Sequence, residues 1–203
     1  MIALIDYGMG NLGSVSNALR FIECDFKITS DPDELMAAEG AILPGVGAFG
    51  DCMDNLREYD LVDAIRDYVA ADRPFLGICL GLQLLFTEGE EMGTHAGLDI
   101  VPGRVVRFTH DLKIPQIGWN QIEPRQDCPQ LEGIPAGSYV YFVHSYHVVP
   151  EDDSVIATVT DYGYEFCSAI RRGNLFATQF HPEKSSEIGL SILRNFTGMV
   201  DAQ

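Results

Sequence analysis

The stretch "FLGICLGLQLLF", residues 75–86, changes from strand-like to helix-like spacing of its apolar residues at Cys79. Gly77 and Gly81 stand two positions away from this cysteine on either side. A sharp strand-to-helix turn lifts its central residue above a sheet, and small neighbours make that turn possible. The stretch therefore predicts a nucleophile elbow in which sulfur replaces the usual hydroxyl. A buried structural cysteine is the alternative interpretation.

Strands and helices alternate on both sides of this junction as far as residue 86. We expect strands over residues 2–8, 25–30, 40–45 and 74–79, and helices over residues 11–23, 31–39, 61–71 and 80–86. From residue 103 the pattern becomes strand after strand: 103–108, 114–123, 138–149, 155–163, 166–174 and 175–181, followed by a closing helix over 185–200. The alternation predicts an α/β fold with an open, mainly parallel central sheet flanked by helices, with additional antiparallel strands in the second half. No composition shift marks a boundary, so residues 1–203 are expected to form a single domain.

Composition excludes several classes of function. The net charge of −17, with 13 Lys and Arg against 30 Asp and Glu, disfavours nucleic acid as a partner. It fits either a salt-adapted host or simply a soluble acidic protein. No apolar run is long enough to cross a membrane and the start does not resemble a signal peptide, so we expect a cytoplasmic protein. The odd number of widely spaced cysteines predicts neither a disulfide framework nor a cysteine-rich zinc site; they are Cys24, Cys52, Cys79, Cys128 and Cys167.

Partners for a reactive thiol occur in "QFHPE", residues 179–183. A nucleophilic cysteine needs a base, and that base needs an acceptor that orients it. His181 and Glu183 supply both groups around a proline, although a capped strand end is the simpler alternative. Other histidines do not suggest a metal site: His144 and His147 are three apart in a strand-like run and are expected on opposite faces.

A glycine-rich segment, "LPGVGAFGD" at residues 43–51, follows another strand. Its glycines leave backbone N–H groups free, and acyl transfer needs such donors for a tetrahedral oxyanion. We expect the N–H groups near Val46 and Gly47, together with that of Leu80 after the nucleophile, to form the oxyanion hole. A common glycine turn is the alternative, but ligands of open α/β sheets also bind at such strand ends.

The segments "PGVG" (44–47), "GICLGLQ" (77–83) and "HPE" (181–183), in this order, resemble the class I (triad) glutamine amidotransferases. Five longer segments are similar to the glutaminase subunits of imidazole glycerol phosphate synthases, in histidine biosynthesis: "DYGMGNLGSV" (6–15), "PGVGAFGDCM" (44–53), "IGWNQI" (117–122), "YFVHSYH" (141–147) and "FHPEKSSEIGL" (180–190). The resemblance covers essentially the whole chain.

The resemblance implies hydrolysis of L-glutamine to glutamate and ammonia through a cysteinyl thioester. Cys79 would be the nucleophile, His181 the general base and acid, and Glu183 the group that orients it. The residues that match the glutamine-binding positions of the family are Gln83, Ser145 and Tyr146. Neither a metal nor an organic cofactor is implied.

The resemblance also implies a partner. A (βα)₈-barrel cyclase subunit would form a heterodimer with this chain and use the ammonia to make imidazole glycerol phosphate and aminoimidazole carboxamide ribotide. The positions that match the docking face are Asn11, Trp119, Tyr141 and Lys184. Each has a simpler alternative, in the same order: a helix cap, core filler, a strand aromatic and a solvated charge. A peptide flip between Gly45 and Gly47 could switch an oxyanion donor on and off, which would couple glutamine hydrolysis to the partner.

Three alternatives stay open at this point. The same glutaminase chemistry could serve another synthase, of pyridoxal phosphate, anthranilate or guanylate. A cysteine-elbow peptidase or redox-stress protein could share the fold, although neither needs "HPE" or a glutamine four residues after the nucleophile. A non-catalytic interaction module is the third, and an intact set of Cys79, His181 and Glu183 disfavours it.

Overall fold

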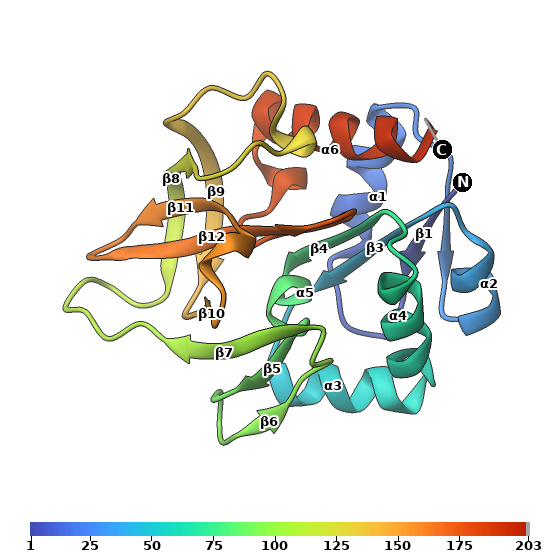
Figure 1. Ribbon diagram of the computed structural model, residues 1–203, viewed down its shortest axis with the longest axis horizontal. Helices are drawn as coiled ribbons and strands as arrows, with labels where there is room; N and C mark the ends of the chain where they lie inside the picture. The colour runs from blue at the N-terminus through green and yellow to red at the C-terminus, as the bar shows by residue number, and fades with distance from the viewer. Residues whose placement is uncertain (202–203) are drawn as a thin grey trace.

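The computed structural model describes residues 1–201, which form one extended sheet with helices on both faces (Figure 1). The main run of the sheet has the strand order β2-β1-β3-β4-β13-β12-β10-β7-β5-β6. This arrangement confirms the predicted α/β fold, with a parallel first half and an antiparallel second half.

The parallel half carries the ends of the strands that hold the predicted site. It consists, in spatial order, of β2 (Phe26–Thr29), β1 (Ile2–Ile5), β3 (Gly40–Gly45), β4 (Phe75–Cys79) and β13 (Leu175–Thr178). Every residue of β1, β3, β4 and β13 is buried, as expected of strands covered on both faces. Because these strands run parallel, the carboxyl ends of β3, β4 and β13 meet at one edge.

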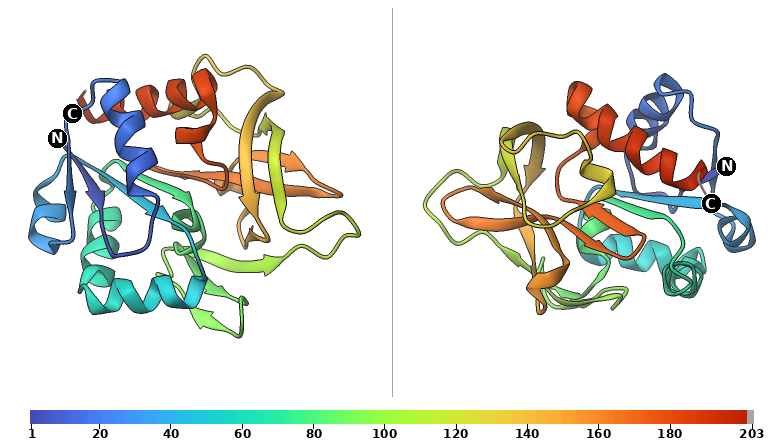
Figure 2. Two further views of the ribbon diagram at one scale, coloured as in Figure 1. Left: turned by 180° about the vertical axis from the view of Figure 1, so that it is seen from behind. Right: turned by 45° about the horizontal axis from the view of Figure 1, so that its top comes forward.

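Helices cover the two faces of this half. α1 (Leu12–Phe21) and α6 (Ser186–Asp201) lie together on one face, whereas α3 (Phe49–Glu58) and α4 (Leu61–Ala70) lie on the other, as the views from the front and from behind agree (Figures 1 and 2). The short α2 (Pro32–Ala37) packs beside α4. Two hydrophobic cores result, one on each face of the sheet.

The antiparallel half continues the sheet from β13. The strands are β5 (Phe86–Gly89), β6 (His95–Ala96), β7 (Val101–Arg107), β8 (Gln116–Pro124), β9 (Ser138–His144), β10 (Tyr146–Pro150), β11 (Ile156–Asp161) and β12 (Glu165–Arg172). β11 pairs with both β12 and β8, and β8 pairs with β9, so the β8–β9 hairpin branches off the main sheet. Only the β5–β7 pair in this half is parallel.

Two local predictions were wrong in the extent of an element, and a third was wrong in the direction of two side chains. The helix expected over 80–86 is the single turn α5 (Leu80–Gln83), since the chain enters β5 at Phe86. The run 138–149 is two strands that separate at Ser145. The rings of His144 and His147 therefore do not point apart from one straight strand: both contact Phe108, with ring centroids 5.1 and 4.8 Å away.

One helix, α3, was not predicted. The glycines around residue 47 are typical of a turn. The residues that follow nevertheless show helical spacing of apolar side chains, and all four are at most 1% exposed: Phe49, Cys52, Met53 and Leu56.

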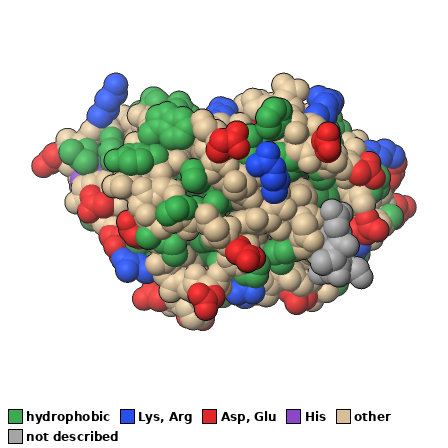
Figure 3. Space-filling view, turned by 90° about the horizontal axis from the view of Figure 1, so that it is seen from above, with side chains coloured by type: hydrophobic (Ala, Val, Ile, Leu, Met, Phe, Trp, Pro, Cys, Tyr) green, Lys and Arg blue, Asp and Glu red, His purple; other side chains and the backbone are tan. Residues whose placement is uncertain are grey.

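One face of the molecule shows how its charged side chains are distributed (Figure 3). Seen from above, Asp and Glu side chains are scattered over the face, interspersed with Lys and Arg rather than gathered into one patch (Figure 3). Among residues 1–201, no helix combines the length and the apolar character that a membrane crossing requires.

Candidate active site

Cys79 is the last residue of β4 and the first point of the turn into α5. Its backbone has φ +56° and ψ −109°, a conformation that residues with a side chain rarely adopt. The turn presses α5 against β3: a Cβ atom on Gly81 would lie 2.0 Å from the carbonyl oxygen of Leu43. Glycine is therefore required at position 81, and the segment has the strained geometry of a nucleophile elbow.

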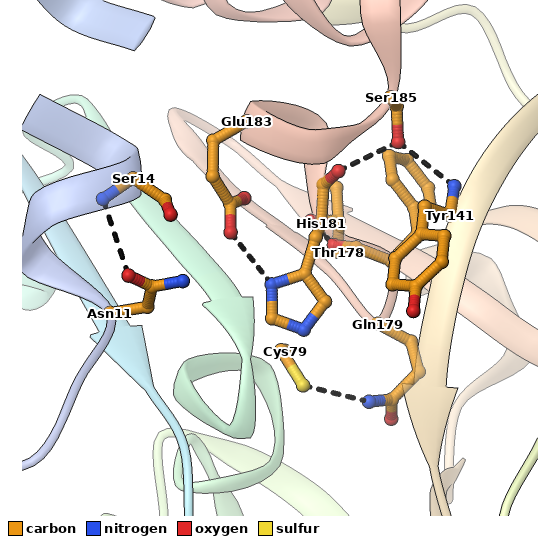
Figure 4. Close-up of polar contacts among 10 residues, drawn as sticks. Asn11, Ser14, Cys79, Tyr141, Thr178, Gln179, His181, Glu183 and Ser185 are labelled. Carbon is orange, nitrogen blue, oxygen red and sulfur yellow. Dashed lines mark hydrogen bonds and ion pairs between the residues drawn. The ribbon is translucent and has the colours of Figure 1, made fainter. Parts of the chain in front are cut away.

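His181 and Glu183 come from the segment that follows β13, the strand beside β4. The Nδ1 nitrogen of His181 lies 2.8 Å from the Oε1 oxygen of Glu183, and their side chains are 2% and 1% exposed. The buried Nε2 nitrogen of His181 has no hydrogen bond of ordinary geometry within residues 1–201, and it faces the sulfur of Cys79 (Figure 4).

The charge state of His181 depends on these two neighbours. Burial by itself lowers the pKa of His181, but the interactions with Cys79 and Glu183 outweigh burial and raise its pKa well above the usual range. A protonated imidazole beside the sulfur favours the thiolate, which is the nucleophilic form of cysteine.

The backbone of His181 is fixed to the neighbouring strand β9. The N–H of His181 donates to the carbonyl oxygen of Tyr141 over 3.0 Å. The hydroxyl of Ser185 accepts from the N–H of Tyr141 at 2.9 Å and donates to the carbonyl oxygen of His181 at 2.6 Å (Figure 4). A displacement of β9 at Tyr141 would thus be transmitted directly to the imidazole.

The end of β3 forms another wall of the site. Gly47 has φ +102°, which favours glycine, and Val46 beside it is 39% exposed. Two buried side chains hold this segment. The hydroxyl of Tyr7 donates to the carbonyl oxygen of Pro44 at 2.9 Å, and the thiol of Cys52 lies 3.5 Å from the carbonyl oxygen of Val46. Burial, with Cys52 as its neighbour, raises the pKa of Tyr7 well above its usual value, so this phenol stays a neutral donor.

A cavity of about 320 Å³ opens over these groups. It is lined by the thiol, the imidazole and all six residues predicted for the oxyanion hole and for glutamine binding. The lining residues are Val46, Gly47, Cys79, Leu80, Gln83, Glu91, Pro115, Val143, His144, Ser145, Tyr146, His181 and Lys184. Apart from the thiol and the imidazole, Glu91 and Lys184 are the charged residues of this lining, one acidic and one basic.

Two residues, one at the cavity and one at the thiol, were missed by the sequence analysis. Glu91 lines the cavity from the loop after β5, and its Oε2 oxygen accepts from the N–H of Phe49 at the start of α3 over 2.8 Å. Gln179 is fully buried two residues before His181, and its side-chain nitrogen lies 3.8 Å from the Cys79 sulfur. For Gln179 a signal existed, since it stands in the same "QFHPE" segment; for Glu91 the sequence holds none.

The positions predicted for the docking face have different surroundings. Asn11 caps α1 by accepting from the N–H of Ser14 at 3.2 Å (Figure 4). Trp119 is 51% exposed, so it is not core filler, and its ring stacks edge-on against half-buried Tyr141 with centroids 6.1 Å apart. Lys184 is exposed at the rim of the cavity. The structure therefore leaves Trp119, Tyr141 and Lys184 wholly or partly accessible, and Asn11, which caps α1, is half-buried.

No His, Cys, Asp or Glu cluster of three or more in the described residues could hold a metal ion. Nucleophile, base, orienting carboxylate and backbone donors around one cavity can instead perform acyl transfer from an amide without any added group.

Comparison with known proteins agrees with this chemistry. Residues 3–199 match the model of the family described as glutamine amidotransferase class-I. Relatives named "Imidazole glycerol phosphate synthase subunit HisH" include one from Syntrophotalea carbinolica, 54% identical over 98% of this chain and 100% of the relative. The relative from Moorella thermoacetica is 53% identical over 98% of this chain and 95% of its own length, and the one from Bacillus cereus is 46% identical over 100% and 96%.

Solved structures agree on the fold. A crystal structure described as a glutamine amidotransferase superposes with a TM-score of 0.77 over 99% of this chain and 100% of its own, at 19% identity. The structure of PurLQS from Thermotoga maritima also gives a TM-score of 0.77, over 98% of this chain and 97% of its own, at 18% identity. Because these HisH relatives are 46–54% identical over at least 98% of this chain, the chain belongs to the class I glutamine amidotransferases and, within them, to the HisH subunits of imidazole glycerol phosphate synthase.

Proposed function

We propose that this chain hydrolyses L-glutamine and supplies the ammonia to a cyclase subunit, which makes imidazole glycerol phosphate and aminoimidazole carboxamide ribotide in histidine biosynthesis. The observation that carries the glutaminase is the strained turn at Cys79, whose thiol faces an imidazole held 2.8 Å from a buried carboxylate. Two of the rivals lack this support: a redox-stress protein or a non-catalytic module has no use for a buried, paired His181 and Glu183.

The reaction follows from the positions of these groups. The Cys79 thiolate attacks the side-chain carboxamide carbon, and the oxyanion formed points to the N–H groups of Val46, Gly47 and Leu80. The His181 imidazolium gives its proton to the departing nitrogen, so ammonia leaves and a γ-glutamyl thioester remains. Neutral His181 then takes a proton from the water that attacks the thioester. The C–S bond breaks, which restores the thiolate–imidazolium pair, and glutamate leaves and gives its new carboxyl proton to solvent.

The cavity suits the zwitterionic end of glutamine. Glu91 lines the cavity and carries the charge that attracts the α-ammonium group, while Gln83, Ser145 and Tyr146 offer amide and backbone groups for the rest of the amino-acid end. This assignment adds Glu91 to the residues predicted from the sequence.

The partner is a cyclase subunit with a (βα)₈ barrel, bound as a heterodimer through the face that holds Asn11, Trp119, Tyr141 and Lys184. The Tyr141–Ser185–His181 hydrogen bonds support a coupling between docking and the imidazole, next to the proposed peptide flip at Gly45–Gly47. We further propose that residues 1–203 act as one glutamine amidotransferase domain in the cytoplasm.

The test is glutamate release from glutamine by the purified chain, alone and with the cyclase subunit of the same organism and its ribotide substrate. We expect little release by the chain alone, a large rise with both additions, and loss of activity in Cys79→Ala. Equal glutamate release with and without the cyclase would be consistent with the thiol chemistry but would indicate a different synthase as the partner. Release that survives Cys79→Ala would refute the nucleophile.

A further inference from the structure

Gln179 lies beside the nucleophile because of the strand register. β13 pairs in parallel with β4, with Thr178 opposite Ile78, so the next residues along the two strands are Gln179 and Cys79. Gln179 is 0% exposed, and its Nε2 nitrogen lies 3.8 Å from the Cys79 sulfur (Figure 4). The distance is within the range of an N–H···S hydrogen bond.

The direction of this amide is set by a backbone group. The side-chain Nε2 of Gln83 donates to the carbonyl oxygen of Tyr146 at 3.1 Å, and a carbonyl oxygen can only accept. The same nitrogen of Gln83 donates to the Oε1 oxygen of Gln179 at 3.0 Å. The NH₂ group of Gln179 must therefore face away from Gln83 and toward Cys79.

We propose that Gln179 is a fourth side chain of the catalytic machinery: an N–H donor that stabilises the Cys79 thiolate and ties its position to Gln83. The role rests on the proposed function and extends it. A donor that bonds to the charged form of a group favours that form, and a thiolate is a stronger acceptor than a thiol. Gln83 also lines the cavity, so a ligand that reorients the Gln83 amide would change the hydrogen bond to Gln179 and, through Gln179, the contact with the Cys79 sulfur.

Other groups also act on this thiol, so the test must separate them from Gln179. The titratable side chains nearest to Cys79 are His181, which is paired with Glu183 in the segment after β13, and the more distant Tyr7 and Cys52 under β3. Glu91, His144 and Lys184 line the same cavity. None of them accepts from or donates to the Gln179 amide in the described residues.

Two variants and one control isolate the donor. Gln179→Glu keeps the shape and an acceptor for Gln83 but removes the N–H donor and adds negative charge; Gln179→Met keeps the volume and removes both hydrogen bonds. Gln130→Met is the matched control, since Gln130 is also 0% exposed and also contacts a thiol, that of Cys128 at 3.0 Å. Cys128 lines a different pocket, which shares no residue with the cavity at Cys79.

The first readout needs no glutamine. The alkylation rate of Cys79 by iodoacetamide, followed by mass spectrometry of its peptide, is measured against pH in the chain alone. In Gln179→Met we expect the profile to move toward higher pH by about one unit, the size expected for loss of one hydrogen bond to a charged group. Gln179→Glu should move it further, and Gln130→Met should leave it in place.

The second readout is glutaminase activity in the presence of the cyclase and its ribotide substrate. We expect kcat of Gln179→Met to fall about tenfold, by the same hydrogen-bond magnitude, while KM for glutamine changes much less. Unchanged alkylation profiles and unchanged kcat in both folded variants, judged by thermal denaturation, would overturn the role of Gln179. A wild-type complex without glutaminase activity would instead overturn the proposed function, and the alkylation result would still decide on Gln179.

Discussion

The contact between α5 and β3 makes Gly81 a position at which a single added methyl group should impair both stability and activity. A Cβ atom there would lie 2.0 Å from the carbonyl oxygen of Leu43 and 3.0 Å from its carbonyl carbon. Carbon and oxygen in contact lie about 3.3 Å apart, so the two segments must separate by about 1.3 Å in Gly81→Ala. Leu43 is 0% exposed in a strand paired on both sides, so the turn at Cys79 is the part that can move.

The displacement has a cost in stability and a cost in rate. Overpacking of this kind destabilises by about 1–3 kcal/mol. Because Cys79 lies two residues away, we expect it to shift relative to His181 and the end of β3, and a misplacement of about 1 Å in an active site costs on the order of 10² in rate. Gly81→Ala should therefore lose activity well beyond what its loss of stability explains.

The assay pairs urea denaturation with the kcat of the cyclase complex under conditions where each variant is fully folded. Gly198→Ala is the control: Gly198 lies in α6 with nothing within 4 Å of an added Cβ, so alanine should stabilise by roughly 0.5–1 kcal/mol and leave kcat unchanged. A Gly81→Ala protein with wild-type stability and wild-type kcat would refute the reasoning about the close approach.

Further variants test the remaining roles. Loss of the carboxylate in Glu183→Gln should lower the pKa of His181, whose protonated form the carboxylate stabilises; the alkaline fall of kcat should then move to lower pH by at least about one unit, and an unchanged profile would contradict the pairing. Glu91→Gln, which keeps an oxygen for the N–H of Phe49, should raise KM for glutamine about tenfold or more with little change in kcat, and a KM that stays constant would exclude the ammonium contact. Trp119→Ala should weaken binding of the cyclase about 30-fold or more in a titration, as expected of an exposed aromatic anchor, while the midpoint of thermal unfolding stays near wild type. Wild-type affinity would place Trp119 outside the interface.

The alternation of strands and helices was readable from the sequence because it depends on local patterns. The buried runs that became β1, β3, β4 and β13, the Asp31 cap of α2 and the strand–turn–helix at Cys79 all follow from the spacing of apolar residues and from turn chemistry. The motif residues Cys79, His181 and Glu183 were named in the same way, because a nucleophile, a base and an acceptor are recognisable residue types. The structure then brought them together around one cavity.

Features that depend on contacts distant in sequence were not readable. α5 ends after one turn since Leu84 and Leu85 are drawn into the core at the start of β5, and the run 138–149 divides at Ser145 because β9 pairs with β8 whereas β10 pairs with β7. Gln179 reaches the thiol, and Glu91 the cavity, for the same reason. The register of β13 against β4 places Gln179 beside Cys79, and the path of the loop after β5 brings Glu91 to the cavity. The "QFHPE" segment indicates Gln179 only as a neighbour of His181. The sequence by itself thus determined which chemical groups the protein has and in which kind of fold, while the pairing of distant strands decided the neighbours that set the charge, orientation and reach of each group.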